Sequence, residues 1–199
     1  MAANVKENLE MLGVDVKFYH SERSVKKRLV HQRTGQHLLR IDHDVVCTPI
    51  KYEQIDFTGV SAVVVSDYNK GTVTYELIDE LQKKTGLPVF VDTKKTDLAR
   101  FSGCYLKINE LEYSSRTSDG QHMIVTRGGS GVTYMGNEYP VPTVPVFDVC
   151  GAGDTFLAAL VYKFMETGVI DDGIKFAIKA SGITVQHSGV YAPTLEEII

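Results

Sequence analysis

Short apolar runs that each end in a polar cluster constrain the fold of this chain more than any other feature. The runs cover residues 62–65, 89–91, 105–108, 123–125 and 144–149. Amphipathic stretches with helical spacing follow the first and last runs, at 73–85 and 155–167, and another closes the chain at about 172–187. Near-continuous apolar strands that alternate with helices are typical of a mainly parallel sheet covered by helices. The sequence therefore predicts a layered α/β fold.

The polar clusters that end these runs favour a binding site. They lie at 66–71, 92–94, 109–112, 126–131 and 148–154. Parallel strands place their carboxyl ends at one edge of the sheet, where open α/β folds bind ligands. The alternative is that Asp, Asn, Gly and Thr simply form turns there, and this alternative is at least as good for Asp67, Asp92 and Asp97. Five clusters that combine carboxylates, amides and glycines favour a site.

Length and charge exclude several classes of protein. A chain of 199 residues with 43% hydrophobic residues fits one globular domain. The net charge of −4 argues against a basic nucleic-acid binder. No apolar run reaches the roughly 18 residues that a membrane span needs. Three cysteines without a C-x-x-C pair, and a charged start, predict reduced thiols and a cytoplasmic protein.

The remaining segments predict one helix and two hairpins. Residues 4–13 have helical spacing, and 17–20, 28–32 and 37–41 have the pattern of strands, with a turn at 33–36. Residues 132–135 and 138–141 flank Gly136-Asn137, which predicts a type I′ turn.

Gly151-Ala152-Gly153 comes directly before the helical pattern at 155–167. Glycines at a helix start let backbone N–H groups approach an anion, and the helix dipole favours negative charge there. Asp154 has two interpretations: an ordinary helix N-cap, or a base that takes a proton from an attacking hydroxyl. Spacing alone leaves both open.

The segment 148–155, Asp-Val-Cys-Gly-Ala-Gly-Asp-Thr, resembles the C-terminal signature of the ribokinase-type (pfkB) carbohydrate kinases. Asn109-x-x-Glu112 resembles the N-x-x-E element of that family, and 126–131 its T-x-G-x-x-G element. Residues 2–13 are similar to the end of its N-terminal signature. Within the family, 66–71, 92–97 and 38–42 look most like the kinase domain of D-glycero-β-D-manno-heptose-7-phosphate kinases.

This resemblance implies a ribokinase-like, three-layer α/β/α domain over 1–199, with a mainly parallel central sheet. Residues 16–42 would form a small β lid and 60–199 the nucleotide-binding core. The implied activity is phosphoryl transfer from ATP, with Mg²⁺, to a hydroxyl of a sugar or sugar phosphate similar to heptose 7-phosphate.

The resemblance also implies a role for particular residues. Asp154 would be the base, and Gly151, Ala152 and Gly153 the anion hole. Asn109 and Glu112 would organise Mg²⁺ through water, and the nucleotide would contact Asn109, Thr126, Gly128, Gly129 and Gly131. The sugar phosphate would contact Asn4, Lys26, Arg28 and Arg40, although a solvated hairpin face explains the last three equally well.

Departures from the family pattern keep a second hypothesis open. Only residues 14–20 separate Leu12-Gly13 from the lid, where the family has a further strand and helix. We expect an exposed sheet edge, and therefore either self-association as a homodimer or reduced stability. Met1 stands where the family has paired glycines after an N-terminal strand. The alternative function is a non-catalytic nucleotide-binding remnant, or a fragment, that acts through a partner chain.

Overall fold

The computed structural model describes residues 2–22, 25–34, 36–43 and 45–199. Its centre is a six-stranded sheet in the order β3-β4-β5-β6-β7-β8. The strands are β3 (Val63–Asp67), β4 (Val89–Thr93), β5 (Tyr105–Asn109), β6 (His122–Thr126), β7 (Val132–Tyr134) and β8 (Asn137–Tyr139). Strands β3 to β6 are parallel, and β7 and β8 continue the sheet antiparallel. The predicted mainly parallel sheet is confirmed.

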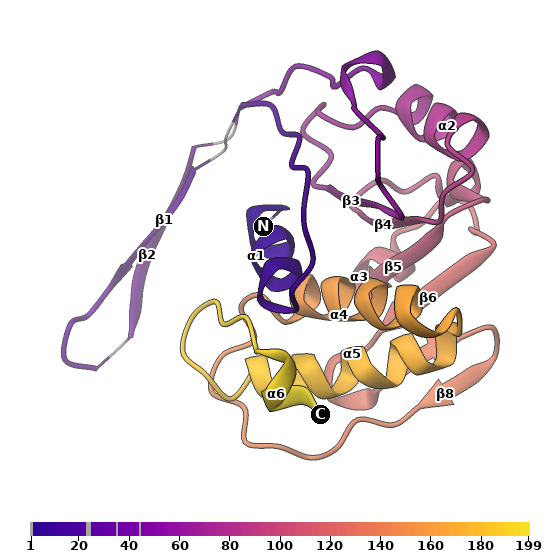
Figure 1. The fold of residues 1–199 in the computed structure, drawn as a ribbon. Coiled ribbons are helices and arrows are strands. Elements are labelled where there is room, and N and C mark those ends of the chain that lie inside the picture. The colour runs from indigo at the N-terminus through magenta and orange to yellow at the C-terminus, as the bar shows by residue number, and fades with distance from the viewer. Residues whose placement is uncertain (1, 23–24, 35, 44) are drawn as a thin grey trace.

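Helices cover the sheet on both faces (Figure 1). They are α1 (Ala2–Met11), α2 (Tyr75–Lys84), α3 (Glu110–Ser114), α4 (Ala152–Thr167), α5 (Ile170–Thr184) and α6 (Leu195–Ile198). Single 3₁₀ turns lie at Tyr52–Gln54, Leu98–Phe101 and Gly128–Ser130.

Alternate residues of the strands contribute to two separate cores. Phe90 packs with α1, α4 and α5 on one face, whereas Val89 and Val91 pack with α2 on the other. The period of two in a strand produces this division. The three-layer arrangement follows from it.

Two predictions of secondary structure are wrong: one strand and the position of one turn. Residues 144–149 form no strand, because Pro142 and Pro145 lack the N–H that a ladder needs. They form a loop whose Phe147 and Asp148 N–H groups donate to the Val185 carbonyl, at 2.7 and 3.1 Å. The turn between β7 and β8 also lies one residue earlier than predicted. Tyr134 pairs with Asn137, so Met135 and Gly136 occupy the turn, with φ values of 47° and 80°.

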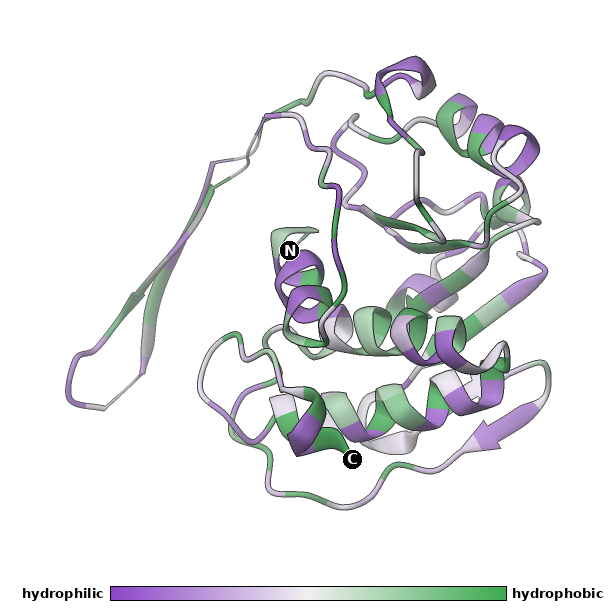
Figure 2. Ribbon diagram, in the orientation of Figure 1, coloured by the Kyte–Doolittle hydropathy of each residue, from purple (hydrophilic) through white to green (hydrophobic). Residues whose placement is uncertain are grey.

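The predicted lid contains a long antiparallel hairpin, β1 (Val25–Val30) and β2 (His37–His43). It projects away from the three layers (Figure 1). Its exposed apolar residues include Leu29, Leu39 and Ile41, and hydrophobic residues run along both strands (Figure 2). Residues 17–20 were predicted as a strand but pair with no sheet; they continue as an extended segment.

Strand β3 is the last strand at its end of the sheet. Beside it lies a cavity of about 860 Å³, lined in part by α1, residues 14–22, β3 and α4. A strand with an open edge is what the short interval at residues 14–20 predicts. Among the described helices, none is long and apolar enough to cross a membrane.

Candidate active site

The loop that begins α4 has the geometry of an anion-binding site. Gly151 is the N-cap residue, with a left-handed φ of 83°. A Cβ at this position would lie 3.0 Å from Asn4 Nδ2, so glycine satisfies both the backbone conformation and the close approach of α1. Gly151, Ala152 and Gly153 therefore form the N-terminal end of a 16-residue helix, which is the positive end of its dipole.

Asp154 is a buried carboxyl group in the first turn of α4, with 3% of its surface exposed. The N-cap interpretation is wrong, because Gly151 holds that position and Asp154 instead accepts a hydrogen bond from Asn4 Nδ2 at 2.9 Å. Asn8 in turn donates to the Asn4 carbonyl at 2.8 Å and to Asn4 Oδ1 at 3.2 Å. Two asparagines of α1 therefore orient this carboxylate.

Burial raises the pKa of Asp154, because it disfavours the charged form. The hydrogen bond from Asn4, the charge of the amino terminus and that of Lys107 oppose this rise, while Asp92 adds to it. A desolvated carboxylate with a raised pKa is a stronger proton acceptor than one in water. This is the property that a general base needs.

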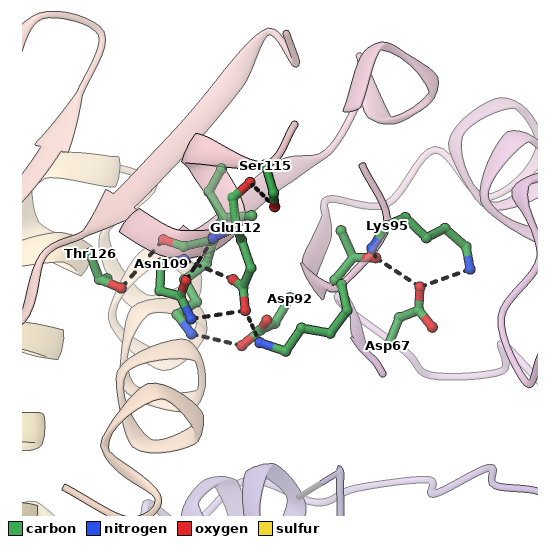
Figure 3. Close-up of polar contacts among 11 residues, drawn as sticks. Asp67, Asp92, Lys95, Asn109, Glu112, Ser115 and Thr126 are labelled. Atoms are coloured by element: carbon green, nitrogen blue, oxygen red, sulfur yellow. Dashed lines mark hydrogen bonds and ion pairs between the residues drawn. The ribbon is translucent and has the colours of Figure 1, made fainter. Parts of the chain in front are cut away.

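Asn109 and Glu112 form the start of α3 (Figure 3). Asn109 Oδ1 accepts from the Glu112 N–H at 2.9 Å, and Glu112 Oε2 accepts from the Asn109 N–H at 2.8 Å. Glu112 Oε1 also accepts from Asn109 Nδ2 at 2.9 Å and pairs with Lys94. The predicted N-x-x-E element is thus a reciprocal capping box at the carboxyl edge of the sheet.

This donor set suits a magnesium ion held mainly by water. Mg²⁺ keeps several waters and binds through one or two carboxylates plus substrate phosphates. Glu112 is the carboxylate available for a water-mediated contact, because its lone pairs are only partly used. The described residues contain no group of three or more His, Cys, Asp or Glu side chains that could form a protein cage for a metal.

Thr126 and the glycines that follow it lie beside this element. Thr126 ends β6 directly opposite Asn109, and its Oγ1 donates to the Ile108 carbonyl at 3.3 Å. Gly128 and Gly131 have φ values of 54° and 100°, and Gly129 has open space around it. The tight turn brings the predicted nucleotide-contacting residues to the same sheet edge as Asn109 and Glu112.

The predicted sugar-contacting residues separate into two places. Asn4 lies against Asp154. Arg40 lies on the projecting hairpin, where Nε and Nη2 donate to the two carboxylate oxygens of Asp42 at 2.7 and 2.6 Å. The side chains of Lys26 and Arg28 lie outside the described residues. In the backbone register of the hairpin, Lys26 pairs with Asp42 and Arg28 pairs with Arg40.

The structure decides the alternatives for the three other aspartates. Asp67 accepts from the Asn69 N–H and from Thr93 Oγ1, both at 2.8 Å, and pairs with Lys95 (Figure 3). Asp97 accepts from Ser118 Oγ at 2.6 Å. Asp67 thus stabilises the turn at Asn69 and connects β3 to β4, and Asp97 connects two loops, so both side chains have structural partners.

Asp92 differs, because it is bound to a lysine that the sequence analysis missed. Lys107 lies in β5 with 4% of its surface exposed, and its Nζ donates to Asp92 Oδ2 at 2.7 Å. Lys94, which pairs with Glu112, was also missed. The available signal was a lysine inside an apolar run at 105–108, where solvation alone does not explain a charge.

Comparisons with known proteins bear on the family and the fold of the chain. Residues 111–198 match the family model described as "pfkB family carbohydrate kinase". "Bifunctional protein HldE" of Hyphomonas neptunium is 28% identical over 262 aligned positions, which cover 99% of this chain and 54% of the relative. The protein of the same name from Aliivibrio salmonicida is 30% identical over 187 positions, covering 78% of this chain and 39% of the relative. The chain thus spans about half, or less, of these relatives.

Solved structures show the same fold. A ribokinase from Thermotoga maritima superposes with a TM-score of 0.71 at 20% identity, covering 98% of this chain and 74% of that one. A nucleoside kinase from Burkholderia thailandensis, solved with inosine, gives 0.72 at 18% identity and covers 99% and 82% of the two chains. The fold is therefore ribokinase-like, as expected from the sequence.

Proposed function

This chain carries a pfkB carbohydrate kinase domain, and from that premise we propose that it transfers the γ-phosphoryl group of ATP to a hydroxyl of a sugar phosphate similar to heptose 7-phosphate. The observation that carries the proposal is the buried Asp154 carboxylate, oriented by Asn4 at the start of α4. The resemblance of residues 66–71, 92–97 and 38–42 to heptose-7-phosphate kinases favours a phosphorylated sugar as the acceptor.

In the proposed reaction, Asp154 accepts the proton of the acceptor hydroxyl. The hydroxyl oxygen forms a bond to the γ-phosphorus, the bond from that phosphorus to the β–γ bridging oxygen breaks, and ADP leaves. Backbone N–H groups of Gly151, Ala152 and Gly153 stabilise the charge on the transferred group. A preorganised donor of this kind contributes roughly 3–4 kcal/mol in other enzymes.

The nucleotide would lie along the carboxyl edge of the sheet, over Thr126 and Gly128 to Gly131. Asn109 and Glu112 would hold the waters of a Mg²⁺ that arrives with the phosphates and neutralises their charge. Asn4 would contact the sugar beside Asp154. Lys26, Arg28 and Arg40, which lie close together in the register of the hairpin, would bind the phosphate of the acceptor. We place this ATP-dependent reaction in the cytoplasm.

The open edge of β3 favours a second candidate function and a dimer. With the 860 Å³ cavity beside the open edge of β3, the chain has a surface that another polypeptide would cover. We propose that it forms a homodimer. A non-catalytic domain that binds nucleotide and acts through a partner chain would have the same surface.

Release of ADP from Mg-ATP by the purified chain separates these candidates. The assay is run alone and with a panel of sugars and sugar phosphates that includes heptose 7-phosphate, and light scattering gives the mass in solution. Release that depends on one sugar phosphate supports the kinase and names its acceptor. Measurable ATP binding without transfer to any acceptor supports the non-catalytic domain instead.

A further inference from the structure

We infer that Lys94 and Lys107 flank the position of the transferred phosphoryl group and bind it as a pair of cations. This inference rests on the proposed function, because it assigns two further residues to the same site. The argument comes from the placement of two ammonium groups that the fold alone does not need.

Lys107 lies directly behind the Gly151–Asp154 loop. A Cβ at Gly153 would be 2.8 Å from Lys107 Nζ, so the ammonium group touches the backbone that begins α4. Asp92 Oδ2, at 2.7 Å, is its hydrogen-bond partner, and the side chains of both residues are 5–6% exposed. The charge is therefore buried at a fixed distance from the loop.

A lysine at this position opposes the stability of the free protein in two ways. Burial of an ion pair costs more free energy than an apolar pair of similar size commonly does. In addition, the positive end of the α4 dipole repels a cation beside it. An anion bound in the loop would reverse the second effect, since it would interact favourably with both the helix and the ammonium group.

Lys94 reaches the same region from the end of β4. Its partner Glu112 already accepts the Asn109 N–H and Nδ2, at 2.8 and 2.9 Å, so the capping box is complete without it. The Lys94 side chain is 35% exposed, against 10% for Glu112. Lys94 is thus free to move from the carboxylate to a phosphoryl oxygen without loss of the start of α3.

The two lysines come from neighbouring strands. Asp92 lies opposite Lys107 in the parallel pair of β4 and β5, and Lys94 follows Asp92 by two residues, at the end of β4. Two ammonium groups held at the same edge of the sheet form a site for a multiply charged anion. With the N–H groups of the loop on one side, the γ-phosphoryl group is the part of ATP that fits there.

The test compares the affinities of the full chain for Mg-ATP and Mg-ADP by calorimetry, because only ATP has the γ-phosphoryl group. In Lys94→Met we expect ATP binding to weaken by about tenfold or more and ADP binding by less than about threefold, as for one lost charge-assisted hydrogen bond. Lys94→Arg keeps the charge and should retain most of the difference between ATP and ADP.

Lys84→Met is the matched control. It removes the same charge at the C-terminal end of α2, where Lys84 pairs with Glu80. That end of the helix leads to the start of β4, at the opposite edge of the sheet. Both affinities should stay at their wild-type values.

Lys107 needs a second variant, because Lys107→Met leaves Asp92 buried without its partner. The double variant Asp92→Asn/Lys107→Met removes both charges of this buried pair and should fold with a melting temperature close to that of the wild type. It should lose ATP affinity selectively, as Lys94→Met does. A purely structural role for Lys107 would change the melting temperature and leave the ratio of the two affinities unchanged.

Equal changes in ATP and ADP affinity in these variants, or no change in either, would overturn the inference, as would a wild-type chain that binds neither nucleotide. The outcome is separable from that of the proposed function. A chain that discriminates ATP from ADP through both lysines but transfers no phosphoryl group would refute only the kinase. If the lysine variants keep the turnover and the nucleotide affinities of the wild type, only the inference is refuted.

Discussion

The carboxyl edge of the sheet and the β1–β2 hairpin contribute to the proposed site in opposite ways. At the sheet edge, Asp154, Asp92 and Glu112 are held by Asn4, Lys107 and Asn109. The hairpin projects from the body (Figure 1), and more than half of the surface of Leu29 and of Leu39 is exposed to solvent. Internal contacts of the fold therefore order the groups that we propose for phosphoryl transfer. A hairpin of two strands is marginal alone, so the proposed acceptor-binding residues on it depend on a ligand or a second chain for their order.

The largest expected difference between these regions is in the free energy of unfolding. Leu160 in α4 is fully buried, and Leu160→Ala should reduce that free energy by about 3 kcal/mol, since it removes packed methyl groups and leaves a cavity. Leu39→Ala, at a position 54% exposed, should change it by less than about 0.5 kcal/mol. Urea denaturation measures both. A comparable loss in the two variants would show that the hairpin is covered in solution.

A smaller effect is expected within the turn at Gly128–Gly131, where we propose that the nucleotide binds. Gly131→Ala puts a Cβ at 2.5 Å from the Tyr139 carbonyl oxygen at a φ of 100°, and should cost about 2 kcal/mol in stability. Gly129→Ala is its control, because Gly129 has no atom within 4 Å of such a Cβ and no left-handed φ. Thermal melting of both proteins checks the difference. If Gly129→Ala proves equally harmful, the turn is not ordered as described.

The hydrogen bond from Asn4 should control the pH dependence of the reaction. Because this bond lowers the pKa of Asp154, Asn4→Ala should raise it and move the acidic limb of the kcat/KM profile to higher pH. Asn8→Ala, which only loosens Asn4, should move it less. We expect about a three- to tenfold lower rate in Asn4→Ala at pH values below the limb, as for one hydrogen bond. A profile that keeps its wild-type position would exclude Asn4 as the group that orients the base.

The smallest effect is on stability as a function of pH. Burial raises the pKa of Asp154 above its usual 3.8 in the folded state, so the folded protein binds the proton more tightly than the unfolded chain. The contribution of this group is therefore largest at low pH and falls as pH rises through the raised pKa. Asp154→Asn should be more stable than the wild type at pH 7, and the two should converge below pH 3.8. Denaturation at several pH values tests this; a less stable variant at pH 7 would contradict it.

The sequence predicted the parts of the fold that depend on local patterns. The parallel strands, the helices at 73–85 and 155–167 and the glycine-rich start of α4 all come from apolar spacing and glycine positions. The prediction of a strand at 144–149 was wrong because it gave the apolar residues more weight than the two prolines, Pro142 and Pro145. The turn at Met135-Gly136 was displaced because a non-glycine residue adopts a left-handed φ there.

Local sequence patterns could not predict which polar side chains pair with one another in the site. Lys107 and Asp92 are 15 residues apart and meet only because β4 and β5 are parallel neighbours. Asn4 and Asp154 are 150 residues apart, and α1 brings them together by packing on α4. The resemblance to carbohydrate kinases gave Asn4 a sugar contact, and its hydrogen bond to Asp154 appears only in the assembled fold.

The most direct test of the account is the turnover of Asp154→Asn, measured with the acceptor found in the panel and alongside the ATP affinity of the same protein. Asn keeps the shape of the side chain and removes the proton acceptor. The account predicts that kcat falls by about 10²–10⁴-fold, the contribution of a positioned base, while the dissociation constant for Mg-ATP stays within about threefold of the wild type. Turnover at the wild-type rate would contradict the assignment of Asp154 as the base.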